Sequence, residues 1–336
     1  MQHYTGLEYI LIDIANNYGM DKELFPKRIQ WAKDTLADPV LLDKAVEEAD
    51  ESLLMIKGIN AYYDAVDGVP TNFTMGLDAT SSGLQIMACL IGCKVTAANV
   101  NLIDTGQRED AYQKVTAVMC DHNCEVERGD IKYPLMTHYY NSKAMPKEQF
   151  GEDSPELAAF YTTLMREFPG AERVKNDSQS LWNPEAEFHQ WNTPDGHTSR
   201  VRVGEYIDSK IEVDELLTHT GNKATFTHRA KIYQPADYGV SLPANIIHSL
   251  DGWVVREMRR RAKLQGFDIL TVHDQFWCHP NHMNNLRQNY IDIMVWICEH
   301  NVLEVIFSTI AGYEIGYTKM SSDLGELVKK AEYPLS

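Results

Sequence analysis

The 336-residue sequence has only six cysteines and no apolar run long enough to cross a bilayer. The longest apolar stretches lie around residues 84–95 and 291–310. The first is too short, and Glu299, His300 and Asn301 interrupt the second. The N-terminus also lacks a basic segment followed by an apolar one, which is the pattern of a secretory leader. We therefore expect no membrane span, no disulfide scaffold and a reduced cytoplasmic location.

Basic residues are scarce. Lys and Arg number 31 against 48 Asp and Glu, which gives a formal net charge of −17. Proteins that bind nucleic acid usually contact phosphates through Lys and Arg, so the bulk charge argues against DNA. The charges are uneven, however, because acidic residues crowd positions 47–51 and a basic stretch occupies positions 256–263. A local basic groove, or a basic partner, is compatible with this distribution.

The thiols offer one weak metal motif. Cys120, His122 and Cys124 lie close together in the sequence, with Cys89 and Cys93 upstream. Zinc binds these residue types, but the spacings match zinc ribbons poorly, so ordinary buried thiols are the favoured interpretation.

The chain contains no internal repeat, low-complexity tract or long Gly/Ser linker. Apolar spacing predicts helices over the first 65 residues, and residues 169–243, rich in polar residues, Gly and Pro, are predicted to be β-ribbon and loop. The other predicted elements are a strand over 73–78, helices over 82–93, 109–123 and 245–265, and a hairpin over 266–280 followed by mostly helical structure. Helices with a small antiparallel sheet imply an α+β fold.

Three segments contain side chains suited to catalysis. In the first, Asp78 ends an apolar strand and is followed by small residues. A strand end can hold a metal-binding carboxylate rigidly. Taken alone, Asp78 is more simply interpreted as the N-cap of a helix that begins at Ser82.

The second segment places Arg128, Lys132, Met136 and Tyr140 at intervals of four, along one helix face. Two cations on one face can bind a triphosphate, although a solvated basic face with a buried tyrosine is the simpler interpretation in isolation. In the third segment, Asp274 lies at a hairpin tip between apolar strands. A charge at that position needs a partner or a metal, unless the aspartate merely forms the turn.

The order of these segments resembles motifs A, B and C of right-handed polymerases, and the chain as a whole resembles the single-subunit RNA polymerases of phages and mitochondria. Four further segments carry the resemblance: DK at 21–22 ahead of FPKRI at 25–29, NVNL at 99–102, WNTPDG at 191–196, and ANIIHSLDG at 244–252.

The resemblance implies a role for each motif residue. Asp78 and Asp274, with the backbone carbonyl of Ala79, would hold two Mg²⁺ ions between the RNA 3′ end and the incoming triphosphate. The catalytic residues are then Asp78, Asp274, Lys132 and Tyr140. Arg128, Lys132 and Lys22 would bind the triphosphate, Tyr140 and His248 would lie at the sugar, and His273 would support the hairpin beside Asp274.

Three positions favour ribonucleotides over deoxyribonucleotides. The related A-family DNA polymerases have a glutamate five residues after the first catalytic aspartate, and Gly83 occupies that position. They also have a glutamate after the His-Asp pair, where this chain has Gln275, and an aromatic residue where it has Met136.

Motif B departs from the family pattern at two positions. Asn141 follows Tyr140 where the family has glycine, and asparagine tolerates the left-handed conformation well. Pro134 would break a regular helix, so we expect the helix to begin or kink near Lys132, with Arg128 on the loop before it.

The implied architecture is a polymerase palm and fingers. Residues 1–95 would form the first part of the palm with motif A, residues 96–247 the fingers with motif B and a specificity-hairpin-like insertion, and residues 248–336 the second part of the palm with motif C. The insertion carries candidate DNA contacts, although a solvated β-ribbon is the alternative: Arg200, Arg202, Lys223, Arg229 and Lys231.

The N-terminal domain, the thumb and a D-x-x-G-R motif of the family are not found in this sequence. We therefore expect a second polymerase subunit to supply them, as in a split, heterodimeric bacteriophage enzyme working in the host bacterial cytoplasm. The expected function is DNA-directed RNA synthesis from NTPs on a DNA template. The alternatives are a catalytically silent DNA-binding or assembly subunit with the same fold, and an A-family-like DNA polymerase.

Overall fold

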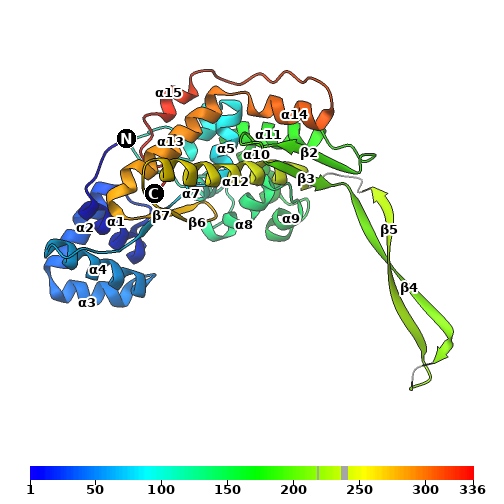
Figure 1. The fold of residues 1–336 in the computed structure, drawn as a ribbon, viewed down its shortest axis with the longest axis horizontal. Helices are drawn as coiled ribbons and strands as arrows, with labels where there is room; N and C mark the ends of the chain where they lie inside the picture. Colours follow the sequence, from blue (N-terminus) through cyan, green and yellow to red (C-terminus); the bar gives the residue numbers. More distant parts are fainter. Residues whose placement is uncertain (218, 236–240) are drawn as a thin grey trace.

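The computed structural model describes residues 1–217, 219–235 and 241–336. Helices predominate, and the strands in these residues form three small antiparallel sheets (Figure 1). The α+β class is therefore confirmed in its coarse form.

The N-terminal segment up to residue 66 is mainly helical, as predicted. It consists of α1 (Gly6–Ala15), a π-helical turn (Asn16–Met20), α2 (Phe25–Ala37), α3 (Pro39–Glu48) and α4 (Ser52–Val66). Thr5 and Glu8 form a capping box that satisfies the first amides of α1. Both chain termini lie near this group of helices (Figure 1).

The sheet that matters for the site joins distant parts of the chain. Its strands are β1 (Met75–Asp78), β6 (Leu270–Val272) and β7 (Gln275–Cys278), in the order β1-β7-β6. The pairing is antiparallel, with Leu77 opposite Phe276 and Asp78 opposite Gln275. Gly76 is required at its position because any Cβ there would lie 2.5 Å from the indole of Trp277.

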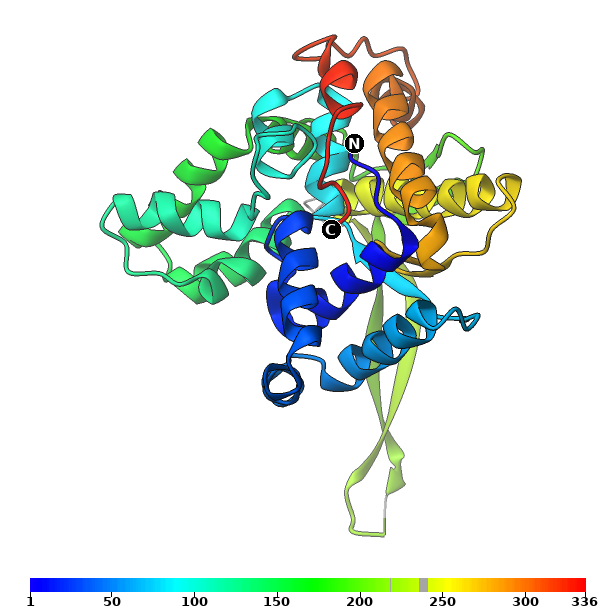
Figure 2. The same cartoon turned by 90° about the vertical axis from the view of Figure 1, so that its left-hand side faces the viewer.

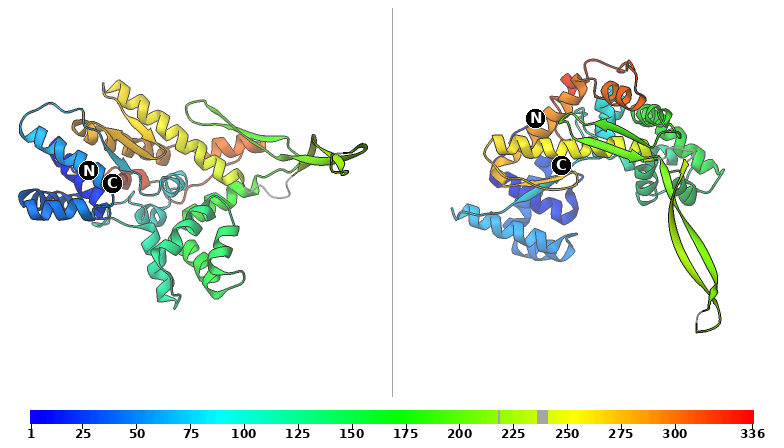
Figure 3. Two further views of the ribbon diagram at one scale, coloured as in Figure 1. Left: turned by 90° about the horizontal axis from the view of Figure 1, so that it is seen from below. Right: turned by 45° about the vertical axis from the view of Figure 1, so that its right-hand side comes forward.

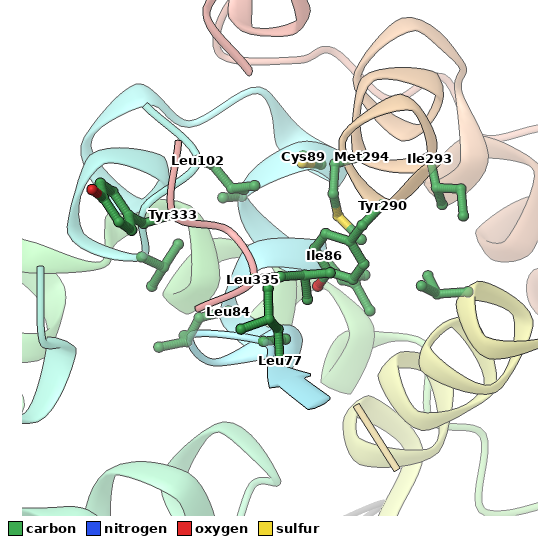
Figure 4. Packing of buried hydrophobic residues seen from close by; sticks show 14 of the residues in the cluster. Leu77, Leu84, Ile86, Cys89, Leu102, Tyr290, Ile293, Met294, Tyr333 and Leu335 are labelled. Carbon is green, nitrogen blue, oxygen red and sulfur yellow. The ribbon is translucent and has the colours of Figure 1, made fainter. Parts of the chain in front are cut away.

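Three helices pack against one another beside this sheet, and α13 also contacts β7: α5 (Ser82–Ile91), α12 (Ser241–Leu264) and α13 (Met283–Glu299). Figure 4 shows Leu77 of β1, Ile86 of α5, Tyr290 of α13 and Leu335 gathered in one apolar core. Gln85, fully buried in this core, accepts a hydrogen bond of 2.6 Å from the Tyr290 hydroxyl. A short 3₁₀ turn, Pro280–His282, precedes α13. After α13 the chain continues through α14 (Val302–Ala311) and α15 (Leu324–Val328).

A second group of helices packs beside α5. It comprises α6 (Lys94–Asn99), α7 (Ala111–Asp121), α8 (Arg128–Tyr139), α9 (Ala144–Phe150), α10 (Pro155–Glu167) and α11 (Pro169–Ser180). The prediction of β-ribbon from residue 169 was therefore wrong for α11. The buried face of α11 includes Gly170, Lys175 and Ser178, so its sequence shows little apolar periodicity.

The remaining strands form two ribbons, as predicted. One is β2 (Phe188–Asn192) with β3 (Thr198–Arg202), and the other is β4 (Gly204–Leu217) with β5 (Lys223–Pro235). The β4–β5 ribbon projects far from the rest of the molecule (Figures 2 and 3). The side chains of Arg229 and Lys231, two of the predicted DNA contacts, lie outside what the structure describes, as do positions 218 and 236–240.

Three arginines in the basic stretch of α12 have carboxylate partners. Arg256 pairs with Asp195 in the turn between β2 and β3, and Arg260 and Arg261 both pair with Glu257. A local basic groove therefore stays a prediction.

Among the described helices, no single one is long and apolar enough to cross a bilayer. One pair, Pro280–Glu299 with Val302–Ala311, reaches that length and apolarity only when taken together, and it is bent by 58°.

Candidate active site

A cavity of about 360 Å³ opens where β1 ends, beside the β6–β7 turn and the side of α8. Eight of the residues selected from the sequence line it: Lys22, Asp78, Ala79, Gly83, Arg128, Lys132, Tyr140 and Asp274. His248 and His273 are not in the lining. The His248 ring contacts the Tyr140 ring, with centroids 4.6 Å apart, and His273 lies in the turn beside Asp274.

The two aspartates meet because their strands pair. The backbone amide of Ala79 donates to the Asp274 carbonyl at 3.2 Å, just beyond the Asp78–Gln275 pair. Burial and the neighbouring charge of Asp274 raise the pKa of Asp78 to about 6. Asp78 does not cap α5, because the N-cap position is Ser81, at a φ of 86°. The capping interpretation of Asp78 was therefore wrong.

The donor set at the strand ends fits a divalent metal. Mg²⁺ prefers oxygen ligands and is usually held by one or two carboxylates together with substrate phosphates. Asp78 and Asp274 supply the carboxylates, while the Ala79 carbonyl accepts from the Ser81 amide at 2.8 Å and keeps one lone pair. Among the described residues, no group of three or more His, Cys, Asp or Glu side chains is placed to hold a metal ion. Cys120, His122 and Cys124 therefore do not form such a group.

The turn that presents Asp274 is two residues long, His273 and Asp274, between paired Val272 and Gln275. His273 has a φ of 54°, in the left-handed region that histidine enters more readily than most residues. Backbone in this region tends to mark functional sites, where the surrounding structure holds it in place.

Helix α8 begins at Arg128, so the prediction that Arg128 lies on a preceding loop was wrong. Asp130 accepts from the Glu127 amide at 2.9 Å, and this capping box starts the helix earlier than Pro134 suggests. Pro134 lies inside the helix and removes one backbone hydrogen bond. Asn141 has a φ of 64°, so the left-handed turn expected after Tyr140 is present.

Two of the predicted phosphate-binding cations already have carboxylate partners. Arg128 Nε lies 2.9 Å from Oδ2 of Asp110, and its guanidinium covers the Tyr112 ring. Lys22 forms an ion pair with Asp21. Sequence reasoning missed Asp110, although an aspartate near the start of a predicted helix is an N-cap signal. Asp110 does cap α7, through the amides of Tyr112 and Gln113.

A third carboxyl group near the pair was also missed. Burial and the charge of Asp274 raise the pKa of Asp251, on α12, to about 6, while Ser82 and His273 oppose that shift. Asp251 was inside a segment selected from the sequence, but no local pattern indicated that α12 turns it toward Asp274. The site therefore concentrates negative charge at the strand ends.

Comparison with known proteins gives a match over most of the chain. The family described as DNA-dependent RNA polymerase matches residues 2–154 and 203–330. The chain belongs to this family. The resemblance drawn from the motifs is thereby confirmed. The segment between the two matched ranges contains α10, α11, β2 and β3.

Individual relatives are distant. The mitochondrial DNA-directed RNA polymerase of Schizosaccharomyces pombe is 20% identical over 89% of this chain and 31% of its own length. The human mitochondrial enzyme is 22% identical over 84% of this chain and 27% of its own length. The DNA-directed RNA polymerase of Pseudomonas phage phiKMV is 28% identical over 34% of this chain and 16% of its own length. The chain thus spans about a third or less of these relatives.

Proposed function

We propose that the chain contains the catalytic centre of a DNA-directed RNA polymerase and transfers ribonucleotides to a growing RNA on a DNA template. The observation that carries this proposal is the cavity in which Asp78 and Asp274, far apart in sequence, share a lining with Arg128, Lys132 and Tyr140. A family match supports the chemistry.

The reaction is phosphoryl transfer, so positioning and charge neutralisation provide most of the catalysis. Asp78 and Asp274, with the Ala79 carbonyl, would hold two Mg²⁺ ions, which supply activation of the RNA 3′ hydroxyl and stabilisation of the pyrophosphate. Lys132, Arg128 and Lys22 bind the triphosphate oxygens. Arg128 and Lys22 exchange the carboxylates of Asp110 and Asp21 for phosphate when the nucleotide arrives.

The sugar end of the pocket favours ribose. The rings of Tyr140 and His248 contact each other at the position assigned to the sugar. His248 would also lie near the minor groove of the hybrid. A Cβ built on Gly83 would meet only Ile247, at 3.7 Å, so packing does not require glycine there. Leaving that space empty admits a 2′ hydroxyl, which disfavours the A-family-like DNA polymerase.

The proposed architecture assigns residues 1–95 and 248–336 to the palm and residues 96–247 to the fingers, with the β4–β5 ribbon as the specificity-hairpin-like insertion. The net charge of this chain is −17, which is unfavourable for binding DNA. We infer that a basic second subunit supplies positive charge for the DNA. We assign this pair to a bacteriophage, acting in the host bacterial cytoplasm.

The deciding experiment changes Asp274 to Asn and Asp78 to Asn and measures RNA synthesis by the chain reconstituted with its co-purifying partner. Both variants are expected to abolish synthesis. The control is Asp268→Asn, an exposed aspartate just before β6 and outside the cavity lining, which is expected to keep full activity. Unchanged activity in Asp274→Asn would instead support the silent-subunit alternative, and promoter-dependent transcription by the isolated chain would contradict the need for a partner.

A further inference from the structure

Four cations line the cavity: Lys22, Arg108, Arg128 and Lys132. Lys22 and Arg128 are paired with Asp21 and Asp110. Within the described parts of the chain, Arg108 and Lys132 form no ion pair. Arg108 is therefore a guanidinium that reaches the cavity without a carboxylate partner, and none of the motifs assigns it a role.

A hydroxyl group holds Arg108 in place. Its Nε donates to Ser336 Oγ at 2.8 Å, and the same oxygen accepts from Nη2 of the fully buried Arg28 at 3.0 Å. The backbone amide of Ser336 donates to the Asp78 carbonyl at 2.9 Å. The position of Arg108 is thus fixed relative to the strand end that presents Asp78.

The fork of Arg108 remains mostly available. Nη1 makes only a long contact of 3.5 Å to the Glu109 carbonyl, and Nη2 has no hydrogen-bond partner among the described residues. Burial lowers the pKa of Arg108, and the nearby carboxylates of Asp21 and Asp110 partly oppose that shift. A guanidinium withdrawn from water without a direct ion-pair partner is unfavourable until an anion binds it.

We propose that Arg108 binds the triphosphate of the incoming nucleotide, oriented for this by the hydroxyl of Ser336. This inference rests on the function proposed above and adds a residue to it. Arginine suits the task because its planar fork donates two parallel hydrogen bonds to phosphate oxygens. The triphosphate is the ligand, rather than a template phosphate, because Arg108 shares one cavity with Lys132, Arg128 and Asp78.

The ion pairs of Lys22 and Arg128 also indicate the order in which the four cations contact an incoming nucleotide. Lys22 and Arg128 must each leave a carboxylate before they can meet phosphate, whereas Arg108 and Lys132 need not. Arg108 and Lys132 therefore make the first contacts, and the other two cations complete the site afterwards.

The test measures binding of inorganic tripolyphosphate to the full chain by calorimetry, for the wild type, Arg108→Gln, Arg108→Lys and Ser336→Ala. Arg108→Gln is expected to weaken binding about tenfold, in line with the loss of a charge-assisted hydrogen bond. Arg108→Lys should lose less binding affinity than Arg108→Gln, because lysine keeps the charge but not the planar fork. Ser336→Ala should lose less affinity than either. The control Arg259→Gln removes the same charge from the exposed side of α12 and should bind as the wild type does.

Nucleotide kinetics on the reconstituted complex give a second measurement. Arg108→Gln should raise the KM for NTPs about tenfold and leave the affinity for template DNA unchanged. Equal tripolyphosphate binding by Arg108→Gln and wild type, or no binding by the wild type, overturns the inference, and so does a weakened template affinity with an unchanged KM. The proposed function fails separately, if Asp274→Asn still makes RNA, because that substitution leaves the cations in place.

Discussion

His138 of α8 and Glu172 of α11 form a buried pair, with Nε2 of the imidazole 2.5 Å from Oε1 of the carboxylate. Lys175 Nζ lies 2.8 Å from the other carboxylate oxygen. Burial alone would raise the pKa of Glu172, but the hydrogen bonds and charges of His138 and Lys175 lower it instead. Glu172 and Lys175 lie between the two ranges that match the family, and this cluster braces α8, the helix that presents Arg128 and Lys132.

Removing one member of this cluster should loosen α8. Changing Lys175 to Met leaves the Glu172 carboxylate buried with less compensation, and breaking a buried ion pair in this way costs roughly 3–5 kcal/mol. We expect the free energy of unfolding, measured by urea denaturation, to fall by an amount in that range.

The matched control is Glu152→Gln, which breaks an ion pair with Lys147 that is fully exposed. Exposed pairs contribute little, so this variant should unfold at the same urea concentration as the wild type. If Lys175→Met were equally stable, α11 would not be bracing α8 through this cluster.

The carboxyl groups at the strand ends predict an unusual pH dependence. The pKa of Asp78 is raised from 3.8 to about 6, so its ionisation opposes folding. Protonated Asp78 imposes no penalty on the free energy of unfolding below pH 3.8. As the pH rises through 6, the carboxyl group ionises in the folded state and that free energy falls. In EDTA, the Asp78→Asn variant should therefore gain stability over the wild type as the pH rises from 4 to 7, measured as the difference between their melting temperatures. A difference that shrinks over that range would contradict the assigned pKa.

Magnesium should reverse this penalty. A divalent cation between Asp78 and Asp274 would bind their ionised forms and would therefore compete with protons. Adding Mg²⁺ at pH 7.5 should raise the melting temperature of the wild type, and the increase should diminish as the pH falls below 6. Asp78→Asn and Asp274→Asn should show little increase at either pH. An equal Mg²⁺ response in these variants would place the metal elsewhere.

Local sequence patterns predicted the elements of the site better than its contacts. An apolar strand ending in Asp78 and a hairpin with Asp274 at its tip are visible from strand patterns alone. That the two strands pair is a long-range fact, which only the resemblance to a polymerase family supplied. Confirmation came from the register that places Asp78 opposite Gln275.

Other features leave no periodic signal. The start of α8 depends on two carboxylates, Glu127 and Asp130, and the more conspicuous Pro134 suggested a later start. Arg108 was missed because its significance depends on Ser336, at the far end of the sequence. Contacts of this kind are set by packing of distant segments rather than by spacing within one segment.

Gly83 provides the sharpest test of sugar selection. In the first turn of α5, a Cβ would meet only Ile247, at ordinary van der Waals distance, so Gly83→Ala should fold normally. Alanine in place of a helical glycine should stabilise the chain by about 0.5–1 kcal/mol. RNA synthesis by this variant should be preserved, because a methyl group is too short to reach the sugar.

Gly83→Glu should behave differently. A carboxylate in the first turn of a helix is compatible with the helix dipole, so the variant should remain folded. Its side chain would fill the space assigned to the 2′ hydroxyl and bring a further negative charge toward Asp78 and Asp274. We expect kcat/KM for ribonucleotides to fall by more than about tenfold, which is more than 1.4 kcal/mol of transition-state stabilisation, with a smaller loss for deoxyribonucleotides. Equal losses for both sugars would mean that Gly83 faces the metal or the triphosphate, and an unchanged kcat/KM would mean that it does not face the nucleotide.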